Sequence, residues 1–288
     1  MPNLRHHRVA VEGTDLHVVT AGPADGRPLV LLHGWPESWR CWEAVIGALE
    51  GPFRLIVPDQ RGFGRSGMPP GTASYAMGVL VGDLVALLDH FEIPRAGLAG
   101  HDFGGAVTWA AAAVVPDRLD RAVVLAAPHP MRLREAAIEN RRQLAASFYV
   151  WLMHAGERGI ALLAADGFRR LASWAFAGSQ VPERVVAEYV EQWREPGRFE
   201  AMAGWYRANY PPDLFNPDVP FDLPPARVPI RYVHAGHDVA FVPEAARGSG
   251  AFVDAPYDEH VIDHSTHWLP WDAPDEVARL IAEWIVAG

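Results

Sequence analysis

The sequence contains no lysine, since all 25 of its basic residues are arginine. This excludes a Schiff-base lysine, a pyridoxal-phosphate anchor and the lysine of a phosphate-binding P-loop. Cys41 is the only cysteine, so neither an intrachain disulfide nor a thiolate metal cluster can form. The chain also lacks a run of about 18 apolar residues and an N-terminal apolar segment, which argues against a membrane-spanning helix and a secretory signal. We therefore expect a cytoplasmic protein that does not contact a membrane.

The composition is that of an ordinary globular protein. The 288 residues are 50% apolar and 21% charged, which suits one large core with a cap or a small second domain. The formal net charge is −10, so a nucleic acid is not expected as a partner. These numbers leave a monomer and a homodimer equally open.

Strand and helix patterns alternate along most of the chain. A hairpin-like pattern spans 9–19, and apolar strand patterns lie at 28–32, 53–57, 96–99, 121–126, 230–233 and 253–262. Helical spacing of apolar residues occurs at 75–91, 104–115 and 273–285. This alternation predicts a mostly parallel sheet with helices on both faces. It stops between 130 and about 221, where the residues predict several helices and no clear strand.

The segment Gly100-His101-Asp102-Phe103-Gly104 lies between a strand pattern and an alanine-rich helix pattern. Its Gly-x-Asp-x-Gly spacing is that of a nucleophile elbow, a tight turn with no room for side chains two residues to either side. The turn would present Asp102 at a helix N-terminus, where backbone N–H groups favour an anion. A carboxylate is already charged at neutral pH and can attack a saturated carbon to form an ester. A helix N-cap is the alternative interpretation of Asp102.

Two further polar residues follow strand patterns later in the chain. Asp238 comes after the 230–233 strand, and His267 lies between the last strand and the final helix. Open α/β sheets place their chemistry at the carboxyl ends of strands, so both side chains are expected near Asp102. A histidine oriented by a carboxylate can take a proton from water. The chain order Asp102, Asp238, His267 is that of nucleophile, acid and base in α/β hydrolases, although His267 alone is also compatible with a structural role.

These residues resemble the α/β-hydrolase superfamily and, within it, the epoxide hydrolases that use an aspartate nucleophile. The resemblance covers nearly the whole chain. The segment 33–39 (HGWPESW) is similar to that family's HGxP oxyanion loop, and 58–66 (PDQRGFGRS) is similar to its next loop. The segment 100–105 is similar to its elbow, with Phe103 where tryptophan is usual. Thr266 stands where glycine often precedes the histidine, so the conformation of that loop is expected to differ.

The resemblance implies a division of the chain into three segments. Residues 1–130 and 221–288 would form the α/β-hydrolase core, and residues 131–220 would form a helical lid. The resemblance also implies two lid tyrosines, and the residues around Tyr149 and Tyr206 are similar to the two lid motifs. Two phenols facing the nucleophile can hydrogen-bond an epoxide oxygen and donate a proton as the ring opens. Phe148 would take the first position if the alignment changed by one residue, and lid packing is the alternative role for both tyrosines.

The resemblance further implies that a small apolar epoxide and water react to give a vicinal diol. Asp102 would form a hydroxyalkyl ester, and His267, held by Asp238, would activate the water that hydrolyses it. The backbone N–H groups of Trp35 and Phe103 would hold the resulting oxyanion. This chemistry requires no metal and no organic cofactor.

Other functions stay open. Haloalkane dehalogenases use the same aspartate chemistry with two halide-holding donors; Trp35 has a side-chain N–H, but Phe103 has none. Fluoroacetate dehalogenases carry arginines beside the nucleophile, where this chain has Phe103 and Val107. A non-catalytic ligand receptor on the same fold is disfavoured only because every catalytic position is filled. An esterase is disfavoured because the elbow lacks serine.

Two other patterns point to different chemistry. The segment 62–67 spells GxGxxG after a strand, but Pro69 and Pro70 follow where a dinucleotide site needs a helix. His260, His264 and His267 are clustered without the helical HExxH spacing of a zinc site. We therefore expect neither a nucleotide cofactor nor a zinc ion.

Overall fold

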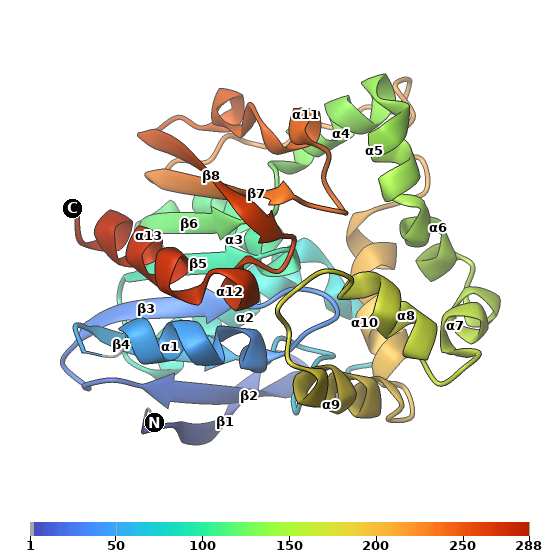
Figure 1. The fold of residues 1–288 in the computed structure, drawn as a ribbon. Helices are drawn as coiled ribbons and strands as arrows, with labels where there is room; N and C mark the ends of the chain where they lie inside the picture. Colours follow the sequence, from blue (N-terminus) through green and yellow to red (C-terminus); the bar gives the residue numbers. More distant parts are fainter. Residues whose placement is uncertain (1–2, 50, 288) are drawn as a thin grey trace.

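The computed structural model describes residues 3–49 and 51–287, which contain an eight-stranded sheet (Figure 1). The strands are β1 (Arg5–Val11), β2 (Thr14–Ala21), β3 (Arg27–Leu32), β4 (Phe53–Pro58), β5 (Ala96–His101), β6 (Leu119–Leu125), β7 (Ile230–His237) and β8 (Tyr257–Thr266). Their order across the sheet is β1-β2-β4-β3-β5-β6-β7-β8. The β1–β2 and β2–β4 pairs are antiparallel, and the other neighbouring pairs are parallel. The predicted mostly parallel sheet is confirmed.

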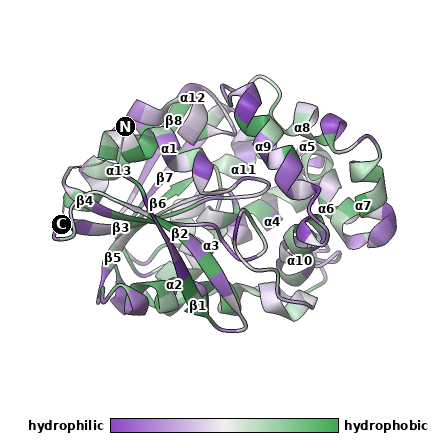
Figure 2. Cartoon of the chain, turned by 90° about the horizontal axis from the view of Figure 1, so that it is seen from below, coloured by the Kyte–Doolittle hydropathy of each residue, from purple (hydrophilic) through white to green (hydrophobic). Residues whose placement is uncertain are grey.

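Helices cover both faces of this sheet. One face carries α1 (Glu43–Leu49), α12 (Leu269–Asp272) and α13 (Pro274–Val286), and the other carries α2 (Met77–His90) and α3 (Phe103–Val114) (Figure 2). Successive side chains of a strand point to opposite faces. In β3, Leu29 and Leu31 therefore pack with α1 and α13, while Val30 packs with α2 and α3. Both faces are apolar, which explains why the central strands are continuous hydrophobic runs.

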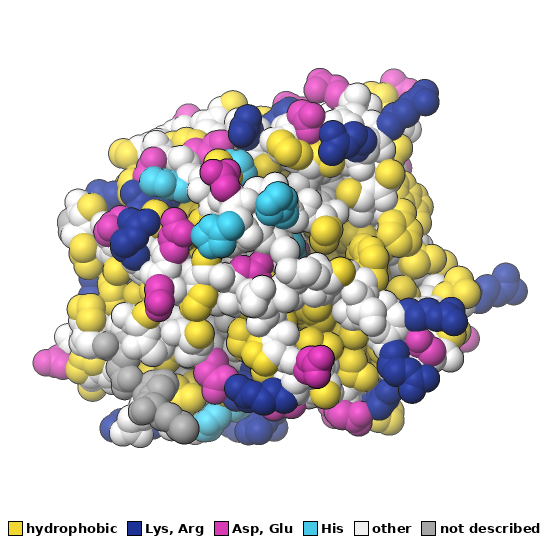
Figure 3. Space-filling model, in the orientation of Figure 1, with side chains coloured by type: hydrophobic (Ala, Val, Ile, Leu, Met, Phe, Trp, Pro, Cys, Tyr) yellow, Lys and Arg dark blue, Asp and Glu magenta, His cyan; other side chains and the backbone are white. Residues whose placement is uncertain are grey.

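A group of helices is inserted between β6 and β7, as the sequence predicts. They are α4 (Pro130–Glu139), α5 (Arg141–Ala146), α6 (Phe148–His154), α7 (Glu157–Ala164), α8 (Arg169–Ala175), α9 (Glu183–Trp193) and α10 (Arg198–Asn209). We call these seven helices the cap. The cap lies beyond one end of the sheet (Figure 1). Exposed apolar side chains of the cap include Leu144, Phe148, Trp151, Leu162 and Trp174, and Figure 3 shows apolar surface gathered on this side of the molecule.

Short elements complete the fold. They are α11 (Pro243–Ala246) and the 3-10 turns η1 (Trp39–Trp42), η2 (Thr72–Tyr75), η3 (Pro116–Arg118) and η4 (Ser249–Phe252). The chain from the end of α10 to β7 forms neither a helix nor a strand, apart from an isolated bridge at Ala226. No helix in the described part of the chain is long and apolar enough to cross a bilayer.

Several boundaries differ from the expected ones; β7, expected at 230–233, continues to His237, and two other elements show the cause. The helix expected at 75–91 begins at Met77, because its N–H donates at 2.8 Å to the side-chain oxygen of Asn209 on α10, a contact between distant parts of the chain. The last strand, expected at 253–262, begins at Tyr257 and continues to Thr266. Pro256 precedes its first residue, and Val253 instead forms the isolated bridge with Ala226.

Candidate active site

Asp102 occupies the sharp turn between β5 and α3. The strand ends at His101 and the helix begins at Phe103, so Asp102 alone makes the turn. Its φ of 51° is positive, a conformation that costs a non-glycine residue about 1–3 kcal/mol. A Cβ on Gly100 would collide with the carbonyl of Gly104, and one on Gly104 with the backbone of β3. Asp102 stands at the N-cap position of α3, but its carboxylate makes no capping hydrogen bond.

The two oxygens of the Asp102 carboxylate have different partners. Oδ1 accepts a hydrogen bond from the backbone N–H of Trp35 at 2.8 Å, and the backbone N–H of Phe103 also supports the negative charge. Oδ2 lies 3.6 Å from Nε2 of His267, and the side chain is 11% exposed. Burial alone would raise the pKa of Asp102, but hydrogen bonding to His267 and the charge of its imidazole hold that pKa below its usual value. The carboxylate is therefore ionised.

His267 lies between two carboxylates. Its Nδ1 is 3.0 Å from Oδ2 and 3.1 Å from Oδ1 of Asp238, and its Nε2 faces Asp102. Asp238 is held in turn, since its Oδ1 accepts hydrogen bonds from the backbone N–H groups of Ala240 and Phe241. Burial alone would lower the pKa of His267, but the negative charges and hydrogen bonds of the two carboxylates raise it to about 10. The imidazole therefore carries a proton at neutral pH.

The segments 33–39 and 58–66, which lie near Asp102, are joined to each other by hydrogen bonds. Nε2 of His33 accepts the backbone N–H of Gln60 at 2.9 Å, and the Gln60 side chain donates to the His33 carbonyl at 2.5 Å. The buried Asp59 carboxylate accepts the N–H groups of Trp39 and Arg65 at 2.9 Å. These bonds fix the loop that presents the N–H of Trp35 to Asp102.

Two cap tyrosines lie near the Asp102 carboxylate. Tyr149 on α6 and Tyr206 on α10 line the same two small cavities as Asp102. Their ring centroids are 5.6 Å apart, edge to face, and both rings contact Trp35. Burial is the main reason that the pKa of each phenol is raised, and the negative charge of Asp102 adds to it. Both phenols therefore keep their protons and can act as hydrogen-bond donors.

The structure distinguishes Tyr149 from its neighbour Phe148. The Phe148 side chain is 50% exposed and contacts Trp174 at the cap surface, whereas the Tyr149 ring stacks on Trp35 inside the site. Thr266, at the position where glycine is common, makes two hydrogen bonds to Asp272, at 2.8 Å from its N–H and 2.5 Å from its hydroxyl.

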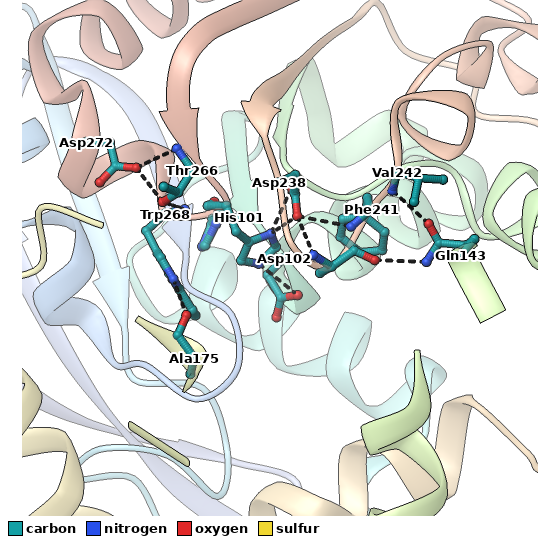
Figure 4. Close-up of polar contacts among 12 residues, drawn as sticks. His101, Asp102, Gln143, Ala175, Asp238, Phe241, Val242, Thr266, Trp268 and Asp272 are labelled. Atoms are coloured by element: carbon teal, nitrogen blue, oxygen red, sulfur yellow. Dashed lines mark hydrogen bonds and ion pairs between the residues drawn. The ribbon is translucent and has the colours of Figure 1, made fainter. Parts of the chain in front are cut away.

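The cap also contacts the loops that carry these residues. Gln143 on α5 donates to the carbonyl of Ala240 and accepts the N–H of Val242, both at 2.9 Å, which fixes the Asp238 loop (Figure 4). The indole of Trp268, next to the histidine, donates to the carbonyl of Ala175 on α8 at 2.7 Å. Cap and loops are therefore joined by buried polar contacts.

Sequence reasoning missed two features of the site. Tyr210 borders one of the Asp102 cavities and packs edge to face on Phe103. Its position four residues after Tyr206, at the C-cap of α10, was the available signal. The second feature is a fully buried pair, Glu37 and His101, whose Oε2 and Nδ1 lie 3.3 Å apart. Nε2 of His101 lies 2.9 Å from the backbone carbonyl of His267.

Among the described residues, no group of three or more His, Cys, Asp or Glu side chains is arranged to hold a metal ion.

Comparison with known proteins gives consistent matches. The family model described as alpha/beta hydrolase fold matches residues 27–274. The AB hydrolase superfamily protein YfhM of Bacillus subtilis is 30% identical over 99% of both chains. Epoxide hydrolase 3 of Xenopus tropicalis is 29% identical over 96% of this chain and 76% of its own length.

Solved structures agree with these sequence matches. An epoxide hydrolase from metagenomes of hot environments superposes with a TM-score of 0.85, at 29% identity, over 99% of both chains. An epoxide hydrolase from Bacillus megaterium has the same fold, with a TM-score of 0.85 at 23% identity, over 96% of this chain and 99% of its own. The family model matches most of the chain, residues 27–274, so this protein belongs to the α/β-hydrolase fold family.

Proposed function

We propose that this protein is an epoxide hydrolase that opens an epoxide to a vicinal diol through an ester on Asp102. Relatives that carry this activity in their names match it over nearly its whole length. The observation that carries the proposal is local: one Asp102 oxygen faces His267 and the other is held by a backbone N–H. Two protonated phenols, Tyr149 and Tyr206, line the same cavities.

The first half of the reaction forms the ester. Oδ2 of Asp102 attacks the less hindered epoxide carbon, a C–O bond forms and the ring C–O bond breaks. The ring oxygen takes a proton from Tyr149 or Tyr206. The resulting tyrosinate regains a proton from the His267 imidazolium, whose pKa falls once the Asp102 charge has been consumed. Ester formation therefore leaves His267 neutral, and neutral His267 is the base that ester hydrolysis needs.

The second half hydrolyses the ester. Neutral His267 removes a proton from water, and the hydroxide attacks the ester carbonyl carbon. The backbone N–H groups of Trp35 and Phe103 stabilise the tetrahedral oxyanion, a contribution of roughly 3 kcal/mol per donor. Asp238 stabilises the imidazolium that forms. The ester C–O bond then breaks, the diol oxygen takes the proton of the hydroxyl group that was added to the carbonyl carbon, and Asp102 returns as a carboxylate beside the imidazolium.

A single turnover in heavy-oxygen water tests this route. With enzyme in excess over styrene oxide, the first diol should carry no label, because its new oxygen comes from Asp102. The label should then appear in the peptide that contains Asp102. Direct labelling of the diol would refute the ester. The Asp102→Ala variant should form no diol and take up no label, which controls for hydrolysis elsewhere.

A haloalkane dehalogenase is the second candidate, and one observation favours it. The indole Nε1 of Trp35 is buried without a hydrogen-bond partner among the described residues, so it is available as one halide donor. The ring of Phe103, which contacts Tyr206, offers no second N–H. Halide release from a haloalkane panel, set against diol formation from styrene oxide, separates the two functions.

We also infer that residues 131–220 act as a lid over the core segments 1–130 and 221–288. Both phenols come from this segment, and its contacts reach the loops of the acid and the histidine. The cytoplasmic location, the absence of a cofactor and the monomeric or homodimeric state stay predictions from the sequence.

A further inference from the structure

A large apolar cavity lies beside the candidate active site, against α2 and α3. Its volume is about 450 Å³, within the range of cavities that bind small organic ligands. Val81 and Met77 of α2 and Trp109 and Ala110 of α3 form one wall. The chain after α10, through Leu214, forms the opposite wall.

This cavity borders the site that holds Asp102. Tyr210 and Ala106 line both the large cavity and the small cavity that contains Asp102, Phe103 and Tyr206. The two cavities that border Asp102 measure only about 30 Å³ each, room for little more than one or two water molecules. A substrate with more than a short substituent therefore needs further space, and the large cavity is adjacent.

The lining of the large cavity carries no ionised side chain. No arginine, aspartate or glutamate is among its lining residues. The amide of Asn209 is already used, because its nitrogen donates to the carbonyls of Tyr75 and Trp205 and its oxygen accepts the N–H of Met77. Burial lowers the pKa of His129 to about 4, so this lining residue is neutral at pH 7. A charged group would lose its hydration here without a partner, which costs several kcal/mol or more.

The outer wall is held in place although it has no helix or strand. The guanidinium of Arg134 on α4 donates to the carbonyls of Leu214, Asn216 and Val219 at 2.8, 2.9 and 2.6 Å. It also lies 5.9 Å from the ring centroid of Phe221, which lines the cavity. Between the two cavities stands the ring of Tyr210, which packs on the rings of Phe103 and Tyr206 with centroids 5.5 and 6.2 Å apart.

We infer that the large cavity binds the long, uncharged alkyl arm of the epoxide, which reaches it from Asp102 by passing between Tyr210 and Ala106. The inference rests on the proposed function and specifies its substrate class. Burying one methylene contributes about 0.8 kcal/mol, which corresponds to about fourfold in kcat/KM. The preferred substrates are therefore long-chain alkyl epoxides.

A chain-length series tests this substrate class. Terminal epoxides from epoxybutane to epoxydodecane should show kcat/KM rising by two- to fourfold per methylene. The Ala110→Phe variant, which fills the cavity away from the carboxylate, should retain the wild-type rate on epoxybutane and lose at least tenfold on epoxydodecane. Ala161→Phe, the same change at an exposed alanine of α7, should follow the wild type. A second variant, Leu223→Trp on the opposite wall, should show the same loss on epoxydodecane. The test then does not depend on the folding of Ala110→Phe alone.

Equal chain-length profiles for Ala110→Phe and Ala161→Phe would overturn the inference. Equal rates for an epoxide with a terminal carboxylate and for its methyl ester would overturn the requirement for an uncharged arm. If no epoxide yields diol, the proposed function fails, and calorimetry with dodecanol tests the cavity separately. Binding that Ala110→Phe abolishes and Ala161→Phe retains would support an alkyl site, and no binding to the wild type would exclude it.

Discussion

Removing the charge of Asp102 should make His267 far easier to deprotonate. Nε2 of His267 lies 3.6 Å from Oδ2 of Asp102, and both side chains are nearly buried, at 5% and 11% exposure. At an effective dielectric constant of about 20, unit charges at that distance attract by about 4–5 kcal/mol. Since 1.36 kcal/mol is a tenfold change in a protonation equilibrium, the Asp102→Asn substitution should weaken proton binding to His267 on the order of a thousandfold.

Nuclear magnetic resonance of labelled imidazole rings measures this effect. In the wild type, the pKa of His267 should be about 10, and its signal is assigned with a His267→Gln variant. The Asp102→Asn variant should titrate at a clearly lower pH, while the Asp258→Asn variant serves as the control. Asp258 lies 2.9 Å from Nε2 of His260, a separate carboxylate–imidazole pair, so its substitution should leave the His267 titration unchanged. Intact mass must show that the introduced amide persists.

The reasoning would be refuted by an ordinary pKa for His267 in the wild type. It would equally be refuted if Asp102→Asn left that titration in place, because the Asp102 charge would then not control the imidazole. An effect of Asp258→Asn as large as that of Asp102→Asn would point to a general change in fold rather than to a local charge.

Three further predictions follow from the same geometry. Tyr206→Phe and Tyr149→Phe should each slow ester formation by roughly a hundredfold, measured as the pre-steady-state rate on styrene oxide; a full rate for Tyr206→Phe would remove that phenol from the mechanism. Asp238→Asn should slow hydrolysis more than formation, so that an enzyme adduct of epoxide mass accumulates in intact mass spectra; no adduct under excess substrate would contradict the role of base orienter. Because the pKa of His267 is raised from 6.5 to about 10, the folded state keeps a proton that the unfolded state loses, so the unfolding free energy should fall as pH rises across that interval. Denaturant titrations should show this slope in the wild type and a shallower one in His267→Gln.

The sequence predicted the elements that depend on local pattern. Parallel strands with two buried faces are continuous apolar runs, and the carboxyl ends of such strands meet at one edge. Asp102, Asp238 and His267 each follow such a strand, so their proximity could be expected although they are far apart in the chain. The steric demands of the elbow likewise act between neighbours, which is why the glycines around Asp102 were informative.

What the sequence did not predict depends on contacts between distant residues. The first residue of α2 is set by Asn209, and the Asp238 loop is fixed by Gln143, in contacts that no spacing reports. The choice between Phe148 and Tyr149 depended on the rotation of α6 against the core. Tyr210 carries no motif of its own, and only the packing of the cap places it between two cavities.

The charge of Asp102 also gives a reason for the order of the two half-reactions in the proposed mechanism. That charge contributes to the raised pKa of His267 and of both phenols, Tyr149 and Tyr206. While the carboxylate is intact, the imidazole is protonated and cannot act as a base, so water is not activated before a substrate has bound. In the proposed mechanism, ester formation consumes this charge, so the pKa of each neighbouring group should fall at that moment. The phenols become stronger acids as the ring oxygen needs a proton, and the imidazole loses its proton when water must be activated.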